Sequence, residues 1–167
     1  FPLTPQQRIA YVSVGAPGEN TISTALKTNN HADVYLFGSK SAIGKQLMDD
    51  QTGVTTIEKT DSAAVEQLLS TLQQKGYDKI IVGIHNFNRR PANQFGLSAP
   101  SLYLLNALQQ FQHLTLVFGN PYAIQYLQNP RNLFACYEDD DLTQQAAYDI
   151  ITGKIGAKGK LPVTIND

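Results

Sequence analysis

Lys79-Ile80-Ile81-Val82-Gly83-Ile84 is the stretch of this sequence that decides its fold. Its apolar residues fall on both faces of an extended chain, which is typical of a strand in the middle of a parallel sheet. A helix is expected just before it, from Asp61 as N-cap to Gly76, because apolar residues recur there every three to four positions. A helix leading into such a strand indicates a βαβ unit.

Strands and helices alternate on both sides of this unit. Further strands are expected at 8–14, 32–37, 54–57, 114–118, 133–137 and 161–165, and helices at 19–28 (ended by Asn29-Asn30), 39–48, 98–111, 122–127 and 142–152. Right-handed crossovers place helices on both faces of such a sheet. The sequence therefore predicts one flavodoxin-like or Rossmann-like three-layer α/β/α sandwich over residues 8–167, with a mostly parallel sheet of about six strands. Residues 1–7 are expected to be a linker from a preceding domain.

The composition narrows the class of partner. A length of 167 residues suits one domain, and a formal net charge of -1 offers no field to attract nucleic acid or an anionic membrane. No apolar stretch is long enough to span a bilayer. The first residue is Phe1 rather than methionine, so we expect the chain to be part of a larger protein. The single Cys136 lies in the apolar run 133–137 and is expected to be a buried core thiol.

The loop at 85–96 follows the central strand, where parallel sheets present their ligand sites. It combines amides, two guanidinium groups and two aromatic rings, which favours a contact loop for a polar ligand. The alternatives are a solvated crossover loop or a surface that docks another domain. No carboxylate lies near His85 in the sequence to orient it as a base, so a structural role is expected for it. The candidate ligand or docking residues are His85, Asn86, Asn88, Arg89 and Arg90.

Two other loops contain residues that recur in functional sites. Asp139-Asp140-Asp141 could bind a metal, but a cap at Asp141 or Thr143 for the following helix is the stronger expectation, and no metal is predicted. The loop at 15–20 has two glycines but lacks the GxGxxG spacing, and Pro17 removes a donor, so we expect a plain turn into a helix and no cofactor. No complete catalytic set is found in the sequence.

Several segments resemble the C-terminal domain of glycoside hydrolase family 3, in its β-N-acetylglucosaminidase branch. They are the closing motif at 153–165 with Gly159, Lys160, Leu161 and Pro162, the turn Gly119-Asn120-Pro121-Tyr122, Tyr137 followed by Ala146-Ala147, and the opening Phe1-Pro2-Leu3. The match spans most of the chain.

The resemblance implies that the bond-breaking groups belong to an N-terminal TIM-type barrel of the same polypeptide, so no catalytic residue is expected in this chain. The absence of Glu from 83–96 favours the acetylglucosaminidase branch over the β-glucosidase branch, which places an acid/base glutamate in this domain. The whole protein would remove terminal β-linked N-acetylglucosamine by retaining hydrolysis. This domain would pack on the barrel, with the 85–96 loop as a candidate rim for the amino-sugar substrate, and would be inactive alone. A stand-alone small-ligand binding module and a purely structural domain are the competing hypotheses.

Overall fold

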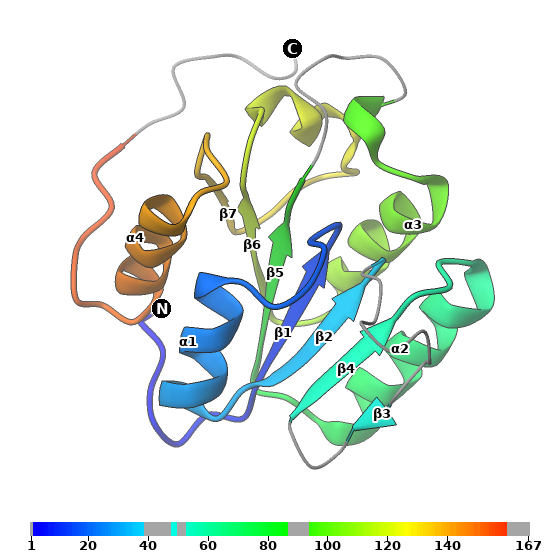
Figure 1. Ribbon diagram of the computed structural model, residues 1–167, viewed down its shortest axis with the longest axis horizontal. Helices are drawn as coiled ribbons and strands as arrows, with labels where there is room; N and C mark the ends of the chain where they lie inside the picture. The colour runs from blue at the N-terminus through cyan, green and yellow to red at the C-terminus, as the bar shows by residue number, and fades with distance from the viewer. Residues whose placement is uncertain (1, 39–47, 50–52, 87–93, 160–167) are drawn as a thin grey trace.

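The chain forms one twisted sheet with helices on both of its faces (Figure 1). The structure, a computed structural model, describes residues 2–38, 48–49, 53–86 and 94–159. The strands are β1 (Ile9–Val14), β2 (Asp33–Phe37), β3 (Met48–Asp49), β4 (Val54–Ile57), β5 (Lys79–Ile84), β6 (His113–Val117) and β7 (Leu133–Ala135). The α-helices are α1 (Thr21–Asn30), α2 (Ser62–Lys75), α3 (Ala99–Ala107) and α4 (Asp141–Ile151), and short 3-10 helices are η1 (Gln94–Gly96), η2 (Leu108–Gln110) and η3 (Pro121–Tyr126).

The sheet has the order β3-β4-β2-β1-β5-β6-β7. All neighbouring strands are parallel except the two-residue β3, which pairs antiparallel with β4. The predicted α/β sandwich with a mostly parallel sheet is therefore confirmed. β5 lies inside the sheet between β1 and β6, as its apolar sequence indicates.

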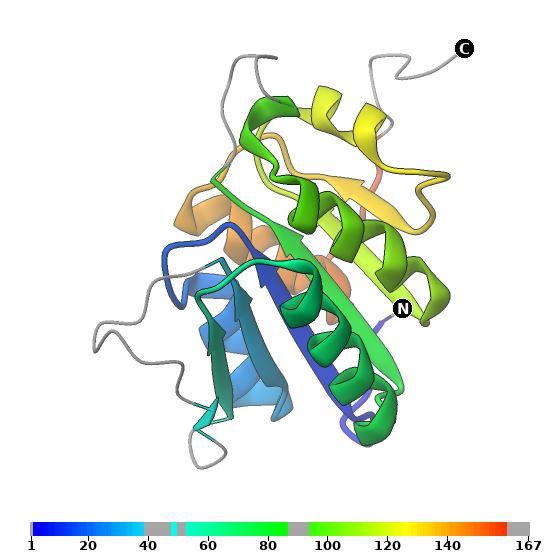
Figure 2. The same ribbon diagram turned by 90° about the vertical axis from the view of Figure 1, so that its right-hand side faces the viewer.

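Each face of the sheet carries its own hydrophobic core. α2 and α3 cover one face and α1 and α4 cover the other, as the two views show (Figure 2). The first core lies between the sheet and α2 and α3, and it includes Val12 and Val14 of β1. The second core lies between the sheet and α1 and α4, and it includes Ile9 and Tyr11 of the same strand. Because successive side chains of a strand point to opposite faces, a strand buried on both sides needs apolar residues at nearly every position.

The helix boundaries follow from local capping. Asn20 caps α1 and forms a capping box with Ser23, and the helix continues through Asn30. The prediction that Asn29-Asn30 ends this helix was wrong, because the chain turns only at His31, which takes a left-handed conformation with φ 54°. Asp61 and Gly76 cap α2 as predicted.

Several other elements differ from the predicted ones in type or in their bounds. The segment expected as one helix at 98–111 is α3 followed by the 3-10 helix η2, and the short helix expected at 122–127 is the 3-10 helix η3. Strand β7 ends at Ala135 rather than Tyr137. Asp140, and not Asp141 or Thr143, caps α4, because its side chain accepts the Thr143 backbone N–H.

Some predicted elements lie outside the described residues. These are the helix at 39–48, apart from Met48, which belongs to β3, and the closing strand at 161–165. Near the other end of the chain, Leu3 is buried and its N–H donates to the Ile151 carbonyl at 2.8 Å, so the segment before β1 packs against α4. In the part of the chain that the structure describes, no helix has the length and apolar character needed to cross a bilayer.

The burial of α1 against the sheet can be tested by shortening a leucine side chain in the second core. Leu26 of α1 is fully buried, whereas Leu142 of α4 is 83% exposed. We expect Leu26→Ala to lower the free energy of unfolding by about 2–5 kcal/mol, because it removes buried methyl groups and leaves a cavity. The matched control Leu142→Ala is expected to change it by less than about 0.5 kcal/mol. Urea denaturation measures both, and equal effects would contradict the burial of α1 against the sheet.

Candidate functional site

The candidate site lies where β1 and β5 end side by side at the carboxyl edge of the sheet. After β1 the chain passes through α1 on one face to β2, whereas after β5 it continues to α3 on the other face and to β6 on the opposite side, so the strand order reverses at this point. Such a switch point is where open α/β sheets bind their ligands. The two strand ends approach closely, since the His85 N–H donates to the Val14 carbonyl at 2.9 Å. At Gly15, with φ 87°, a Cβ would lie 2.5 Å from the His85 carbonyl oxygen, so only glycine fits.

His85 is the buried centre of this site. It is 2% exposed, and its ring stacks on Phe118 with a centroid distance of 4.6 Å. Its Nδ1 lies 2.9 Å from Asp139 Oδ1 and its Nε2 lies 2.7 Å from the Tyr11 hydroxyl. The contacts of His85 therefore join β1, β5 and the segments after β6 and β7.

The neighbours of His85 select one tautomer of its ring. Asn20 Oδ1 accepts the Ser23 N–H as the cap of α1, so Asn20 Nδ2 is the atom that faces His85 Nε2, at 3.3 Å. Burial, and next the charge of Asp139, raise the pKa of Tyr11, so its phenol stays protonated and can donate. When the ring is neutral, two donors thus converge on Nε2, which accepts, and Nδ1 carries the proton that is donated to Asp139.

Asp139 is held by three protein donors. His85 Nδ1 and Gln144 Nε2, the latter at 2.8 Å, donate to its Oδ1, and the Asn86 backbone N–H donates to its Oδ2 at 2.9 Å. Burial raises the pKa of this carboxyl, but the hydrogen bond and the charge of His85, together with hydrogen bonds from Asn86 and Gln144, outweigh burial and lower it. Asp139 is therefore a fixed, ionised carboxylate whose side chain remains 25% exposed at the edge of the sheet.

The partnership of His85 and Asp139 corrects the sequence-based interpretation of His85. The expectation that no carboxylate orients this histidine was wrong, because its partner lies 54 residues later in the chain.

The three consecutive aspartates make different contacts. Asp139 binds His85, Asp140 caps α4, and Asp141 accepts a hydrogen bond from the Thr21 hydroxyl. Within the described ranges no group of three or more His, Cys, Asp or Glu side chains is placed to hold a metal.

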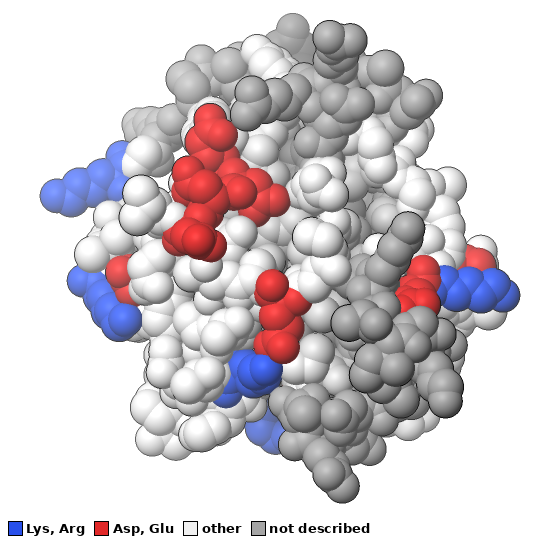
Figure 3. All heavy atoms as spheres, viewed as in Figure 1, with Lys and Arg blue, Asp and Glu red and all other residues white. Residues whose placement is uncertain are grey.

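An open surface pocket of about 790 Å³ lies beside Asp139. We call it the tyrosine pocket; its walls are Asn86, Phe118, Gly119, Asn120, Pro121, Tyr122, Tyr137, Glu138, Asp139 and Asp140. A group of acidic side chains is visible on the same face of the molecule (Figure 3). Two wall residues, Asn86 and Tyr137, have a left-handed backbone, with φ 53° and 69°; asparagine adopts this conformation readily, whereas tyrosine rarely does. A strained residue such as Tyr137 is more common at functional sites.

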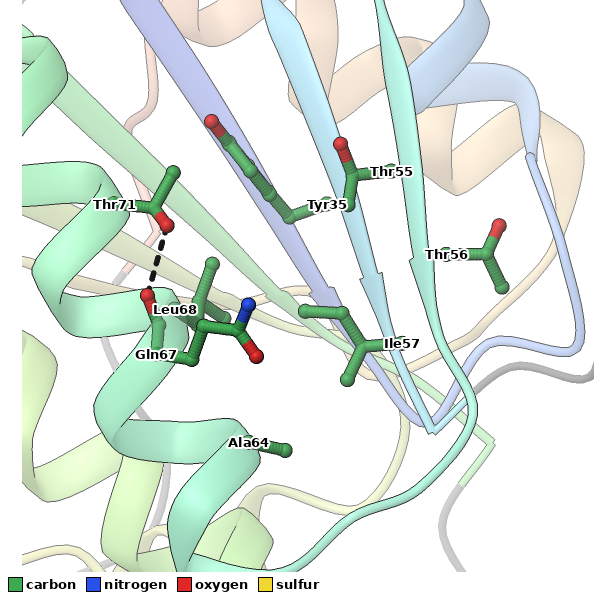
Figure 4. A pocket seen from close by; sticks show the side chains of 8 residues that line it. All are labelled: Tyr35, Thr55, Thr56, Ile57, Ala64, Gln67, Leu68 and Thr71. Atoms are coloured by element: carbon green, nitrogen blue, oxygen red, sulfur yellow. Dashed lines mark hydrogen bonds between the residues drawn. The ribbon is translucent and has the colours of Figure 1, made fainter. Parts of the chain in front are cut away.

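A second hollow lies between α2 and β4, away from the carboxyl edge. Figure 4 shows Tyr35, Thr55, Ile57 and Leu68 around it. Its volume is about 30 Å³, close to the space that one water molecule occupies. This hollow is a small packing gap at the edge of the sheet and is too small for an organic ligand.

The structure places part of the predicted site. His85 and Asn86 lie at the switch point, while Asn88, Arg89 and Arg90 fall outside the described residues. Tyr122 and the preceding motif residues 119–121 form a wall of the tyrosine pocket. Gly159 is described, but Lys160, Leu161 and Pro162 are not.

Cys136 is a half-buried thiol beside the second core rather than a fully buried one. Burial raises its pKa to about 12.

Sequence reasoning missed the roles of Tyr11, Asn20, Asp139 and Gln144. Tyr11 and Ser13 are the two residues with polar groups in β1, and the hydroxyl of Tyr11 is the signal that could have indicated a buried partner.

Gly83 leaves the space that the His85 network occupies. A Cβ at this position would overlap the Tyr11 hydroxyl and lie 2.6 Å from His85 Nε2. We expect Gly83→Ala to lower the free energy of unfolding by about 1–3 kcal/mol, because a methyl group must displace two buried, hydrogen-bonded side chains. Gly156→Ala is the matched control, since a Cβ on Gly156 would meet no atom within 4 Å. Thermal melts that show equal stability for both variants would contradict the packing at Gly83.

Asp139 makes stability dependent on pH in the acid range. Because its pKa is lowered in the folded state, its contribution is complete above the unfolded pKa of about 4 and is lost as the pH falls through the lower folded pKa. Asp139→Asn is expected to lower the free energy of unfolding at pH 7 by about 1–3 kcal/mol, because an amide NH₂ must face a donor. The variant should also lose less stability than the wild type between pH 5 and about pH 2. Glu138→Gln, at the exposed neighbouring position, is the control, and an identical pH profile for both variants would contradict the role of Asp139.

Comparison with solved structures finds proteins that contain a similar fold, whereas comparison of sequences finds none. No family model matches the sequence, and no curated protein matches it. A β-N-acetylglucosaminidase of glycoside hydrolase family 3 from Paenibacillus sp. str. FPU-7 superposes with a TM-score of 0.65 and 19% identity, over 99% of this chain and 28% of that one. A fungal multi-domain β-N-acetylglucosaminidase of the same family gives 0.57 and 18%, over 98% of this chain and 16% of that one.

A β-glucoside phosphorylase bound to 2FGlc gives a TM-score of 0.54 at 18% identity, over 98% of this chain and 27% of that one. In each comparison nearly the whole of this chain matches a minor part of a much longer protein. The chain thus has the fold of the C-terminal α/β region of glycoside hydrolase family 3 proteins.

Proposed function

We propose that this chain is the accessory second domain of a retaining family 3 glycoside hydrolase that removes terminal β-linked N-acetylglucosamine. The observation that carries the proposal is the superposition of 99% of this chain on 28% of a β-N-acetylglucosaminidase of that family. A domain that matches so small a share of an enzyme is expected to act beside another domain. In this proposal it packs on an N-terminal catalytic barrel of the same polypeptide.

The chemistry of Asp139 and Asp140 supports a catalytic site elsewhere. Retaining glycosidases need one carboxyl group as a general acid, with a raised pKa, and a second as nucleophile about 5 Å away. The pKa of Asp139 is lowered, and a hydrogen bond from the Thr143 backbone lowers that of Asp140. Both are therefore ionised near neutral pH and poorly suited to protonate a leaving group. His85 is buried and has both ring nitrogens engaged, so it cannot reach a substrate.

The position of His85 and Asn86, the first residues of the 85–96 loop, supports a role at the rim of a shared site. Both residues lie at the carboxyl edge beside the tyrosine pocket. Arg89 and Arg90 follow four and five positions after His85 and can supply forked donors to sugar oxygens. The absence of Glu from this loop supports the acetylglucosaminidase branch over the β-glucosidase branch.

A stand-alone small-ligand binding module is the second candidate. The observation in its favour is the tyrosine pocket at the switch point, which is the usual ligand position in open parallel sheets. This function requires binding but no barrel, so an assay of the full-length protein separates the two.

Hydrolysis by the full-length gene product tests the proposal. With the upstream region included, we expect it to release nitrophenol from p-nitrophenyl β-N-acetylglucosaminide, whereas the 167-residue chain alone shows no turnover above the uncatalysed rate. The matched substrate p-nitrophenyl β-glucoside should be cleaved much more slowly. Turnover by the chain alone would overturn the assignment of chemistry to the barrel. Failure of the full-length protein to cleave either substrate would overturn the proposed enzyme.

A further inference from the structure

We infer that the tyrosine pocket is a saccharide-binding site, in which Tyr122 and Tyr137 pack against sugar rings and Asp139 accepts a hydrogen bond from a sugar hydroxyl. Of the residues that line this pocket, only Asn86 belongs to the 85–96 loop. The choice of a β-linked N-acetylglucosamine oligomer as ligand rests on the proposed function. The existence of the site rests on the geometry of the pocket.

Two exposed aromatic rings form the apolar part of this site. Tyr122 is 48% exposed and Tyr137 is 43% exposed, although neither is needed to cover the described cores. Both line the same pocket from different elements, since Tyr122 belongs to η3 and Tyr137 follows β7. Tyrosine combines a flat apolar face with a polar hydroxyl, which suits the apolar face and hydroxyl rim of a sugar ring.

The backbone holds Tyr137 in its exposed position. The Glu138 N–H donates to the Cys136 carbonyl at 2.9 Å across Tyr137, whose φ is 69°. This is a three-residue γ-turn with positive φ, which is rare and strained. Tyr137 does not belong to the described cores and lines the pocket, so the packing of those cores gives no reason for the strain.

Asp139 provides a preorganised polar contact. An ionised carboxylate has about four acceptor positions, and the three protein donors already described leave room for one more. Because the side chain is fixed from behind by His85 and Gln144, a ligand hydroxyl that binds it does not have to order it. Preorganisation of this kind reduces the entropic cost of binding.

Charge sets the class of saccharide. The described lining contains the acids Glu138, Asp139 and Asp140 and no lysine or arginine. A neutral sugar therefore meets acceptors without like-charge repulsion. The competing occupant is a cationic peptide, for which the acids alone would suffice and the tyrosine rings would be dispensable.

Titration of the 167-residue chain with chitotriose, followed by amide NMR shifts, tests the inference. We expect saturable shifts centred on Asn86, Tyr122, Tyr137 and Asp139. Tyr122→Ala and Tyr137→Ala should each weaken binding by roughly tenfold, because each removes one aromatic contact. Tyr122→Phe and Tyr137→Phe keep the ring and should retain most of the affinity. Tyr103→Ala is the matched control, since Tyr103 is 45% exposed on α3, where its hydroxyl bonds Glu66, and it should bind as the wild type does.

Three results would overturn the inference: no shifts in the pocket at millimolar chitotriose, equal loss in Tyr103→Ala, or binding of tetralysine in preference to chitotriose. Dispersed spectra show whether each variant is folded, and the phenylalanine variants test the rings if an alanine variant is not. The two proposals can fail separately. If the full-length protein cleaves the glycoside but this chain does not bind chitotriose, the pocket assignment fails and the enzyme stands. If the chain binds but no glycoside is cleaved, the pocket stands and the enzyme fails.

Discussion

The hydrogen bond between His85 Nδ1 and Asp139 Oδ1 connects the parts of the structure that surround the carboxyl edge of the sheet. His85 also contacts Tyr11 of β1 and Asn20 at the start of α1, and Asp139 also contacts Gln144 of α4. The network therefore links strands and helices that are far apart in the sequence. Because its members are largely buried, a lost partner would leave a polar group without compensation, which is far more costly than the same loss in water.

Small residues make this network possible. Gly83 leaves room for the Tyr11 hydroxyl and the His85 ring, and Gly15 lets the chain after β1 pass against the His85 carbonyl. Both glycines lie within or directly after the two strands that form the switch point. Gly15 thus permits the close approach of the two chains just beyond the paired strands, whereas Gly83 leaves room for the side chains of Tyr11 and His85.

The fold was predictable because its signals are local. The apolar run Lys79–Ile84 indicates a buried parallel strand, and Asp61 and Gly76 mark the ends of α2 through capping alone. The site was less predictable, because its contacts join residues that are distant in sequence. His85 and Asp139 are 54 positions apart, and only the parallel arrangement of β5, β6 and β7 brings the loops after them together. The end of α1 was mispredicted for a related reason, since its stop depends on the left-handed backbone of His31 rather than on Asn29 or Asn30.

The same network explains why this edge is suited to binding rather than to bond breaking. A general acid or base must change its protonation state during a reaction, which requires a pKa near the working pH and access to the substrate. The hydrogen bonds to Asp139 lower its pKa, and His85 is enclosed by Tyr11, Phe118 and Asp139. Each donor that fixes the carboxylate also makes it a weaker base. A carboxylate of this kind serves as a permanent acceptor with a defined direction, which is what recognition of a hydroxyl group requires. The physical features that stabilise the carboxyl edge therefore favour its use as a contact surface.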